Sequence, residues 1–250
     1  MYSATHPKYG DVMLKWGTYS SGTSLERIRR EVTLLLSLNS PYFPKNYEFC
    51  IDEKNNIFMI IEERIKGETL DMVSDRFRKE NQIISLLKEI LVAMSRIWDL
   101  QIVHRDLKPQ NIMINKNNEP RIIDFGIARF LAYPSLTKTI AMFGPCTPIY
   151  ASPEQLLNDK YSIDMRSDFF ALGIIILELI YSFHPFDPRK VGNRSSIPEN
   201  IVNSCYLHPK SNHKISSNFA ELVERLLQRQ PYRRFPNHVI FKEYVRKEWI

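Results

Sequence analysis

Two polar motifs stand on either side of a short strand-turn-strand segment in the middle of this 250-residue chain. The first is HRDLKPQN at residues 104–111, and the second is DFG at residues 124–126. The residues between them contain the run NKNNEP, which has the composition of a turn. A hairpin there reverses the chain, so Asp124 is expected close to Asp106 and Asn111. Any fold of this chain therefore has to bring the two motifs together.

The hydrophobic pattern divides the chain into a small strand-rich part and a larger helical part. Strands are predicted at residues 11–16, 47–51 and 57–61, and an amphipathic helix at residues 25–38. Later helices are predicted from residue 153 and at residues 83–100, 168–180 and 219–228. This order predicts an α+β protein, and ligands bind between two such parts.

Composition excludes several classes of protein. The chain is 44% hydrophobic and 25% charged, as in an ordinary soluble globular protein. Its three cysteines are scattered and lack metal-site or disulfide-framework spacing, which fits a reducing compartment. The net charge of +6 comes from basic residues spread along the chain without an aromatic-interleaved strip, so a nucleic-acid partner is not expected.

A membrane partner is not expected either. The longest apolar run, residues 171–177, is interrupted by Glu178 and is far too short to span a bilayer. No signal peptide is visible at the N-terminus. The expected location is therefore the cytoplasm.

The two motifs resemble a known family. Residues 104–111 resemble the catalytic loop of protein kinases, and DFG follows at the family's distance. Either tripeptide alone would be weak evidence, but the eight-residue signature with a correctly spaced second motif is specific. The chain is identified on this resemblance as a member of the protein kinase family, from its first residues to about Phe235.

The resemblance implies a two-lobed protein-kinase-like α+β fold. Residues 1–250 are expected to form one kinase domain. Residues 1–66 would supply a small, strand-rich and incomplete N-lobe with the hinge, and residues 67–250 the larger helical C-lobe.

Phosphoryl transfer needs a carboxylate near the attacking hydroxyl, metal ions on the phosphates, and cations against developing negative charge. The resemblance implies that Asp106 acts on the acceptor hydroxyl and that Lys108 stabilises the transferring group. Asn111 and Asp124 are expected to hold Mg²⁺, which prefers oxygen ligands. A surface turn with ordinary salt bridges does not account for these four residues together.

The resemblance also implies an ATP site. Lys15, in the strand sequence VMLK, would grip the phosphates, and Glu31 on the predicted helix would be its ion-pair partner, with Glu26 as the rival candidate. The residues assigned to ATP are Lys15, Glu31, Glu63, Ile65 and Met113.

Later motifs resemble the family's substrate segment and its structural supports. TPIYASPE at residues 147–154 is similar to the segment that receives a peptide, and Thr147 would hydrogen-bond Asp106 and Lys108. Lys108 and Thr147 are similar to those of serine/threonine kinases, and YASPEQ is similar to the eukaryotic-like kinases of bacteria.

The structural supports are an aspartate and an ion pair. Asp168 would hold the catalytic loop, and an arginine in the PYRR run of residues 231–234 would pair with Glu154. In the long segment before Thr147, Thr137 or Thr139 is expected to become phosphorylated and to be received by Arg105.

The sequence also departs from the family pattern. It contains no Gly-x-Gly-x-x-Gly loop, and its first residues, MYSA, look like the wording that follows that loop. Either the sequence starts just past the glycines or the protein lacks this lid. Met13 replaces the usual alanine, and Glu62 stands where an apolar residue is usual. A buried carboxylate is costly without a partner, so Glu62 is expected to have one, unless the alignment is off by one.

Three functions are compatible with these observations. The leading one is an active, Mg²⁺- and ATP-dependent kinase that phosphorylates serine or threonine hydroxyls of proteins. The second is a catalytically impaired kinase-fold protein that regulates or scaffolds partners. A small-molecule phosphotransferase is the third, and residues 147–154 disfavour it because they resemble a peptide-substrate segment.

Overall fold

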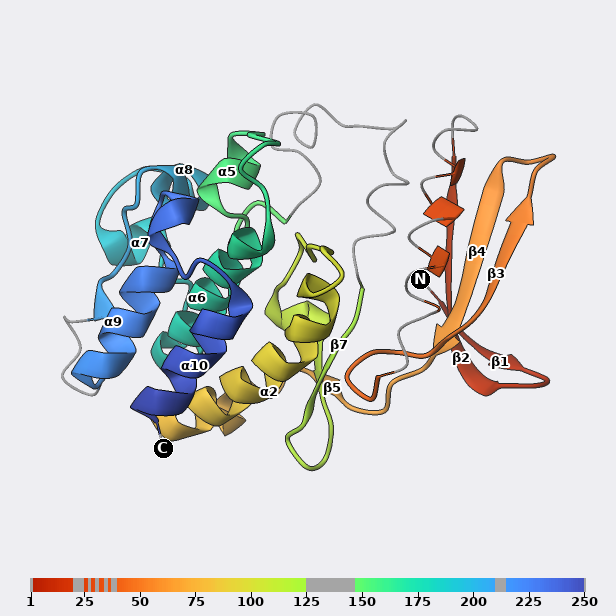
Figure 1. Ribbon diagram of the computed structural model, residues 1–250, viewed down its shortest axis with the longest axis horizontal. Coiled ribbons are helices and arrows are strands. Elements are labelled where there is room, and N and C mark those ends of the chain that lie inside the picture. The colour runs from red at the N-terminus through yellow and green to blue at the C-terminus, as the bar shows by residue number, and fades with distance from the viewer. Residues whose placement is uncertain are drawn as a thin grey trace.

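The computed structural model places most of the chain. It describes residues 2–19, 40–124, 147–209 and 215–249, together with the single positions Leu25, Glu26, Ile28, Arg29, Val32, Thr33 and Leu36. Among the residues with predicted roles, Glu31, Phe125, Gly126, Thr137 and Thr139 lie outside the described residues. Figure 1 shows a strand-rich part at one end of the molecule and a helical part at the other.

The strand-rich part is a four-stranded antiparallel sheet. Its strands are β1 (Tyr2–His6), β2 (Gly10–Thr18), β3 (Asn46–Asp52) and β4 (Ile57–Glu63), in the order β1-β2-β4-β3. The three predicted strands therefore exist, and β1 is an addition to them. Phe58 and Ile60 of β4 pack with Ile28 and Val32 in a small core of their own.

Local chemistry sets the turns of this sheet. The β1–β2 hairpin ends at Gly10, whose φ of 71° is easy for glycine because it has no Cβ. Between β3 and β4, the Asp52 carboxylate accepts the Asn55 backbone N–H at 3.2 Å, which is the turn chemistry that the sequence predicted. Each hairpin sets the register within its own pair of strands, β1 with β2 and β3 with β4.

The helical part has four longer helices, three short ones, three 3₁₀ turns and a small sheet among its described residues. The longer helices are α2 (Glu80–Trp98), α6 (Met165–Tyr181), α9 (Ser217–Leu226) and α10 (His238–Glu248). The short ones are α5 (Pro153–Leu156), α7 (Pro188–Val191) and α8 (Ile197–Val202), and the 3₁₀ turns are η1 (Ser74–Arg76), η2 (Pro109–Asn111) and η4 (Pro231–Arg233). The sheet, in the order β5-β6-β7, contains β5 (Glu68–Thr69), β6 (Ile112–Ile114) and β7 (Pro120–Ile122).

Helix α6 is the centre of the helical part, and it contacts α2 and α9 (Figure 1). Every residue of this helix from Ser167 to Leu177 is buried, because helices cover it on more than one side. Gly173 lets α9 approach closely: a Cβ there would lie 2.9 Å from the Leu226 Cβ. The apolar run at residues 171–177 is therefore a buried core helix, as the sequence predicted.

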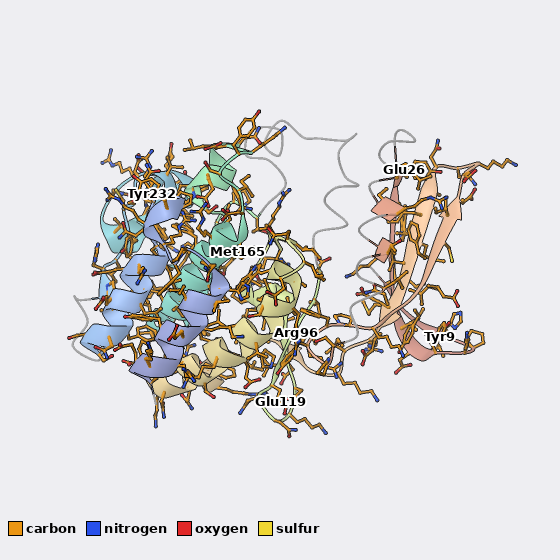
Figure 2. The ribbon with its side chains drawn as sticks, in the orientation of Figure 1. Tyr9, Glu26, Arg96, Glu119, Met165 and Tyr232 are labelled. Atoms are coloured by element: carbon orange, nitrogen blue, oxygen red, sulfur yellow. The ribbon has the colours of Figure 1, made fainter. Side chains whose placement is uncertain are left out.

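The side chains in Figure 2 lie densely between these helices. Tyr9 marks the β1–β2 turn and Glu119 the β6–β7 turn, at well-separated points of the molecule (Figure 2). None of the helices that the structure describes is long and apolar enough to cross a membrane.

Candidate active site

The β6–β7 hairpin brings the two motifs together. The Ile123 backbone N–H donates to the Asn111 carbonyl at 2.9 Å, directly before Asp124. The His104 ring Nε2 lies 3.3 Å from the Ile123 carbonyl. The chain reversal that the sequence predicted is therefore present, and it places Asp124 next to the end of the HRDLKPQN loop.

Asp106 is the centre of a dense hydrogen-bond group. Its Oδ1 accepts the Thr147 hydroxyl at 2.6 Å and the Thr147 backbone N–H at 3.0 Å. Its Oδ2 accepts the Lys108 ammonium at 3.0 Å and the Asn111 Nδ2 at 3.3 Å. Lys108 Nζ also lies 2.9 Å from Thr147 Oγ1, so the predicted bonds from Thr147 to both residues are confirmed.

Asn111 is oriented by the same loop. Its Nδ2 donates to the Asp106 carbonyl at 2.8 Å as well as to the Asp106 carboxylate. With the nitrogen used in this way, the amide oxygen is the atom that can face a cation. Asp124 adds a carboxylate whose side chain is 29% exposed. Two hard oxygen donors on adjoining segments fit Mg²⁺, which is usually bound by one or two protein groups together with substrate phosphates.

A buried aspartate on α6 holds the HRDLKPQN loop in shape. Asp168 accepts the backbone N–H groups of His104 at 3.0 Å and Arg105 at 2.9 Å, and the Trp98 indole N–H at 2.9 Å. Arg105 has a φ of 65°, a conformation that a non-glycine residue keeps only where its surroundings enforce it. Burial raises the pKa of the Asp168 carboxyl, and the three donors oppose that rise because they favour the charged form.

The segment after Thr147 is anchored by a buried ion pair. Arg234 donates to both carboxylate oxygens of Glu154, at 2.7 and 2.9 Å, and the two side chains are 0% and 3% exposed. Ser167 of α6 adds a bond of 2.7 Å to the same carboxylate. The predicted pairing of Glu154 with an arginine of the PYRR run is confirmed, and Arg234 is that arginine.

Two further supports were not predicted from the sequence. The Gln155 amide donates to the Arg105 carbonyl at 2.8 Å, which ties the segment after Thr147 to the HRDLKPQN loop. Tyr150 donates to Glu178 of α6 at 2.7 Å. Burial and the Glu178 carboxylate raise the pKa of Tyr150, so this hydroxyl acts as a donor. Of these two residues, only Gln155 belongs to a local sequence pattern, the S-x-x-Q capping box that starts α5.

Lys15 stands where the two parts meet. Its ammonium lies 2.9 Å from Glu62 Oε1 and 3.5 Å from Asp124 Oδ1. Glu62 is buried, and burial raises the pKa of its carboxyl while Lys15 lowers it. The sequence predicted that a buried Glu62 would have a partner, and that partner is Lys15. Glu31, the partner assigned from the resemblance, lies outside the described residues.

The remaining residues assigned to ATP lie at the same junction. The Glu63 carboxylate is engaged by the Arg121 guanidinium at 3.0 Å and by the Lys45 backbone N–H at 3.1 Å. The Glu63 backbone N–H donates to the Lys45 carbonyl at 2.7 Å, so neither the carboxylate nor the N–H of Glu63 is open to a further partner. Ile65 is half-buried two residues past the end of β4. Met113 is half-buried in β6, on the face opposite to its buried neighbours Ile112 and Ile114.

This arrangement defines a class of protein. The family model described as "Protein kinase domain" matches residues 12–250, and the chain belongs to the protein kinase family. The two-lobed α+β fold expected from the resemblance is confirmed by the strand-rich and helical parts.

Individual relatives resemble the chain at moderate identity. It is 30% identical over 208 residues to an Aurora kinase of Encephalitozoon cuniculi, which covers 82% of this chain and 72% of that protein. It is 28% identical over 229 residues to a probable serine/threonine-protein kinase MARK-A of Dictyostelium discoideum, 91% of this chain. A serine/threonine-protein kinase pkn2 of Myxococcus xanthus is 32% identical over 168 residues, 65% of this chain. The chain spans only 20% of the length of each of the latter two.

Proposed function

We propose that this protein is a Mg²⁺- and ATP-dependent kinase that phosphorylates serine or threonine hydroxyls of proteins. One observation carries the proposal: Asp106, Lys108 and Thr147 form a closed hydrogen-bond group beside Asn111. The Asp106 carboxylate, which would act on the acceptor hydroxyl, is therefore in direct contact with the Lys108 ammonium, which would act on the phosphoryl group. Bound Mg²⁺-ATP would supply the transferable phosphoryl group and the metal charge.

Each residue of the group has a defined task in this proposal. Asp106 orients the acceptor hydroxyl and accepts its proton, a form of catalysis that contributes about 10²–10⁴-fold. Lys108 compensates negative charge that develops on the transferring group, and its contact with Thr147 keeps it in place. Asn111 and Asp124 hold the metal, and the loop that carries Asp106 is preorganised by Asp168.

The nucleotide would bind where the strand-rich part, residues 1–66, meets the helical part, residues 67–250. Lys15 would contact the phosphates, since its ammonium already faces Asp124 across the junction. The backbone at Glu63 and Ile65 would hold the base from one side and the Met113 side chain from the other. Residues past Thr147 would receive a peptide, because Thr147 links them directly to Asp106.

The test is phosphate transfer from γ-labelled ATP to a mixed-sequence acceptor protein such as casein. The protein is incubated with Mg²⁺ or with a chelator, and the labelled amino acid is identified after acid hydrolysis. The proposal expects Mg²⁺-dependent label in phosphoserine or phosphothreonine. Label in phosphotyrosine would contradict the acceptor assignment, and label on a small molecule alone would contradict the protein substrate.

One observation favours the second function, a kinase-fold regulator without catalysis. Lys15 is paired to Glu62, in a position where the family usually has an apolar residue. A lysine kept by this carboxylate would be withdrawn from the phosphates. In that case the protein binds nucleotide weakly and transfers no phosphate with or without Mg²⁺, whereas the kinase proposal requires transfer.

A further inference from the structure

Glu62 and Lys15 meet because of the register of the two central strands. In the β2–β4 ladder, Met13 lies opposite Glu62 and Lys15 lies opposite Ile60. All four side chains therefore share one face of the sheet, and Lys15 and Glu62 are diagonal neighbours. Diagonal positions are about 7–8 Å apart, within reach of two long side chains. The 2.9 Å contact is the product of this geometry.

The pair is nearly removed from solvent. The side chains of Lys15 and Glu62 are 12% and 8% exposed. A charge buried in this way is tolerated only when it is paired, and removing one partner is strongly destabilising. On its other side Lys15 meets Asp124 at 3.5 Å. One ammonium group is therefore held between a carboxylate of β4 and a carboxylate placed to bind metal.

We propose that Glu62 is a positioning residue for Lys15, which it holds at the junction so that the ammonium meets the nucleotide phosphates. The inference rests on the proposed function, because it assigns a role within the same nucleotide site. A partner on β4 has a distinct mechanical consequence. Since a strand register cannot slip by one residue without turning every side chain to the other face, the β2–β4 ladder keeps Glu62 within reach of Lys15.

A Glu62 that competes with the nucleotide would have the opposite effect on nucleotide binding. If Glu62 competed with the phosphates for Lys15, then removing its charge would free the lysine and strengthen nucleotide binding. If Glu62 only filled space in the sheet, then its removal would weaken nucleotide binding by the same factor whether or not Lys15 is present. Only a positioning role predicts a loss of nucleotide affinity that requires Lys15 to be present.

The experiment measures the dissociation constant of Mg²⁺-ATP by calorimetry on the full chain. The variants are Glu62→Gln, Lys15→Met and the double variant. A charge-assisted hydrogen bond contributes about 1.5–3 kcal/mol, so Glu62→Gln is expected to weaken binding about tenfold or more. In the Lys15→Met background the same change should cause no further loss. Glu62→Met, of similar length but without an acceptor oxygen, should weaken binding at least as much as Glu62→Gln and serves where the glutamine variant fails to fold.

Glu48→Gln is the matched control. Glu48 lies in the neighbouring strand β3, where its carboxylate accepts the Tyr9 hydroxyl at 2.9 Å. The control should bind Mg²⁺-ATP as the unmodified protein does. Unchanged or tighter binding by Glu62→Gln, or an equal loss in both backgrounds, overturns the inference while the kinase proposal stands. Failure of the unmodified protein to bind Mg²⁺-ATP overturns both.

Discussion

The side chains around Asp106 divide its two carboxylate oxygens between them. Thr147 occupies Oδ1, and Lys108 with Asn111 occupies Oδ2. Since Asp106 itself is only 6% exposed, its position is set by these bonds and by the loop that carries it. At the residue scale, the proposed chemistry therefore depends on hydroxyl and amide groups as well as on the aspartate.

Replacing Thr147 tests this dependence. Thr147→Val keeps the shape but removes the hydroxyl bonds to Asp106 and Lys108, of 2.6 and 2.9 Å. Because bonds to charged groups contribute about 1.5–3 kcal/mol, phosphate transfer is expected to fall about tenfold or more. Thr147→Ser retains the hydroxyl and should keep most of the activity. Equal rates for the valine and serine variants would show that the hydroxyl has no part in transfer.

The metal assignment makes a separate prediction. Asp124→Asn keeps the side-chain shape, and asparagine tolerates the φ of 64° at this position. The rise in melting temperature caused by ATP should be larger with Mg²⁺ than with chelator in the unmodified protein. The variant should lose most of that difference because it lacks a carboxylate ligand. A full Mg²⁺-dependent rise in the variant would remove Asp124 from the metal site.

Several of these residue contacts could be predicted from the sequence, and one could not. Thr147 with Asp106, and Glu154 with Arg234, follow from motifs whose members have fixed partners. The partner of Lys15 depends on which face of β2 meets which face of β4, which is a long-range property of the sheet. The sequence indicated only that a buried Glu62 needs a partner.

The elements that position the site differ in how visible they are in the sequence. Helix α2 and helix α6 have strong apolar patterns and were predicted to within a few residues. Helix α10 (His238–Glu248) was not predicted, because only three of its residues are fully buried and its polar residues obscure the period. Strand β5 has two residues, too few to carry a period-two pattern, and it exists only through pairing with β6.

The close approach of α6 and α9 gives a prediction at the scale of elements. Alanine is a better helix former than glycine by about 1 kcal/mol, so propensity alone favours Gly173→Ala. The added Cβ, however, would lie 2.9 Å from both the Leu226 Cβ and the Leu227 Cδ2. Overpacking of this kind costs about 1–3 kcal/mol, so a net loss in the free energy of unfolding is expected.

Chemical denaturation measures this loss. Glu221→Ala on the exposed side of α9 is the control, and it should change the free energy of unfolding by no more than about 0.5 kcal/mol. A Gly173→Ala protein more stable than the unmodified one would mean that α9 can shift away from α6 without cost.

At the scale of the whole molecule, stability depends on buried groups far from the reacting atoms. His184, just past α6, has its Nε2 2.8 Å from the Ile149 carbonyl and its Nδ1 3.3 Å from the Phe186 N–H. One neutral tautomer satisfies both contacts, with Nε2 donating and Nδ1 accepting. Burial lowers the pKa of His184 to about 4, against the opposing effects of Ile149 and Asp187.

A lowered pKa makes the fold sensitive to mild acid. As the pH falls below about 6.5, the unfolded chain binds a proton at His184 while the folded protein does not, so stability is lost progressively toward pH 4. The loss attributable to His184 is about 2 kcal/mol by pH 5. It is measured as the difference in unfolding free energy between pH 7 and pH 5, compared with His184→Gln. The variant should lack this part of the pH dependence; identical pH profiles would contradict the assignment.

The site itself is a property of the whole chain, since β2, the catalytic loop, the β6–β7 hairpin and the segment after Thr147 all contribute to it. In the proposed mechanism, Asp106 acts on the acceptor hydroxyl in the transfer step and is not needed to bind nucleotide. The most direct measurement is single-turnover phosphate transfer and Mg²⁺-ATP affinity, both determined on the unmodified protein and on Asp106→Asn. The predicted result is transfer slowed by about 10²-fold or more with affinity essentially unchanged. Equal transfer rates in the two proteins would contradict the account.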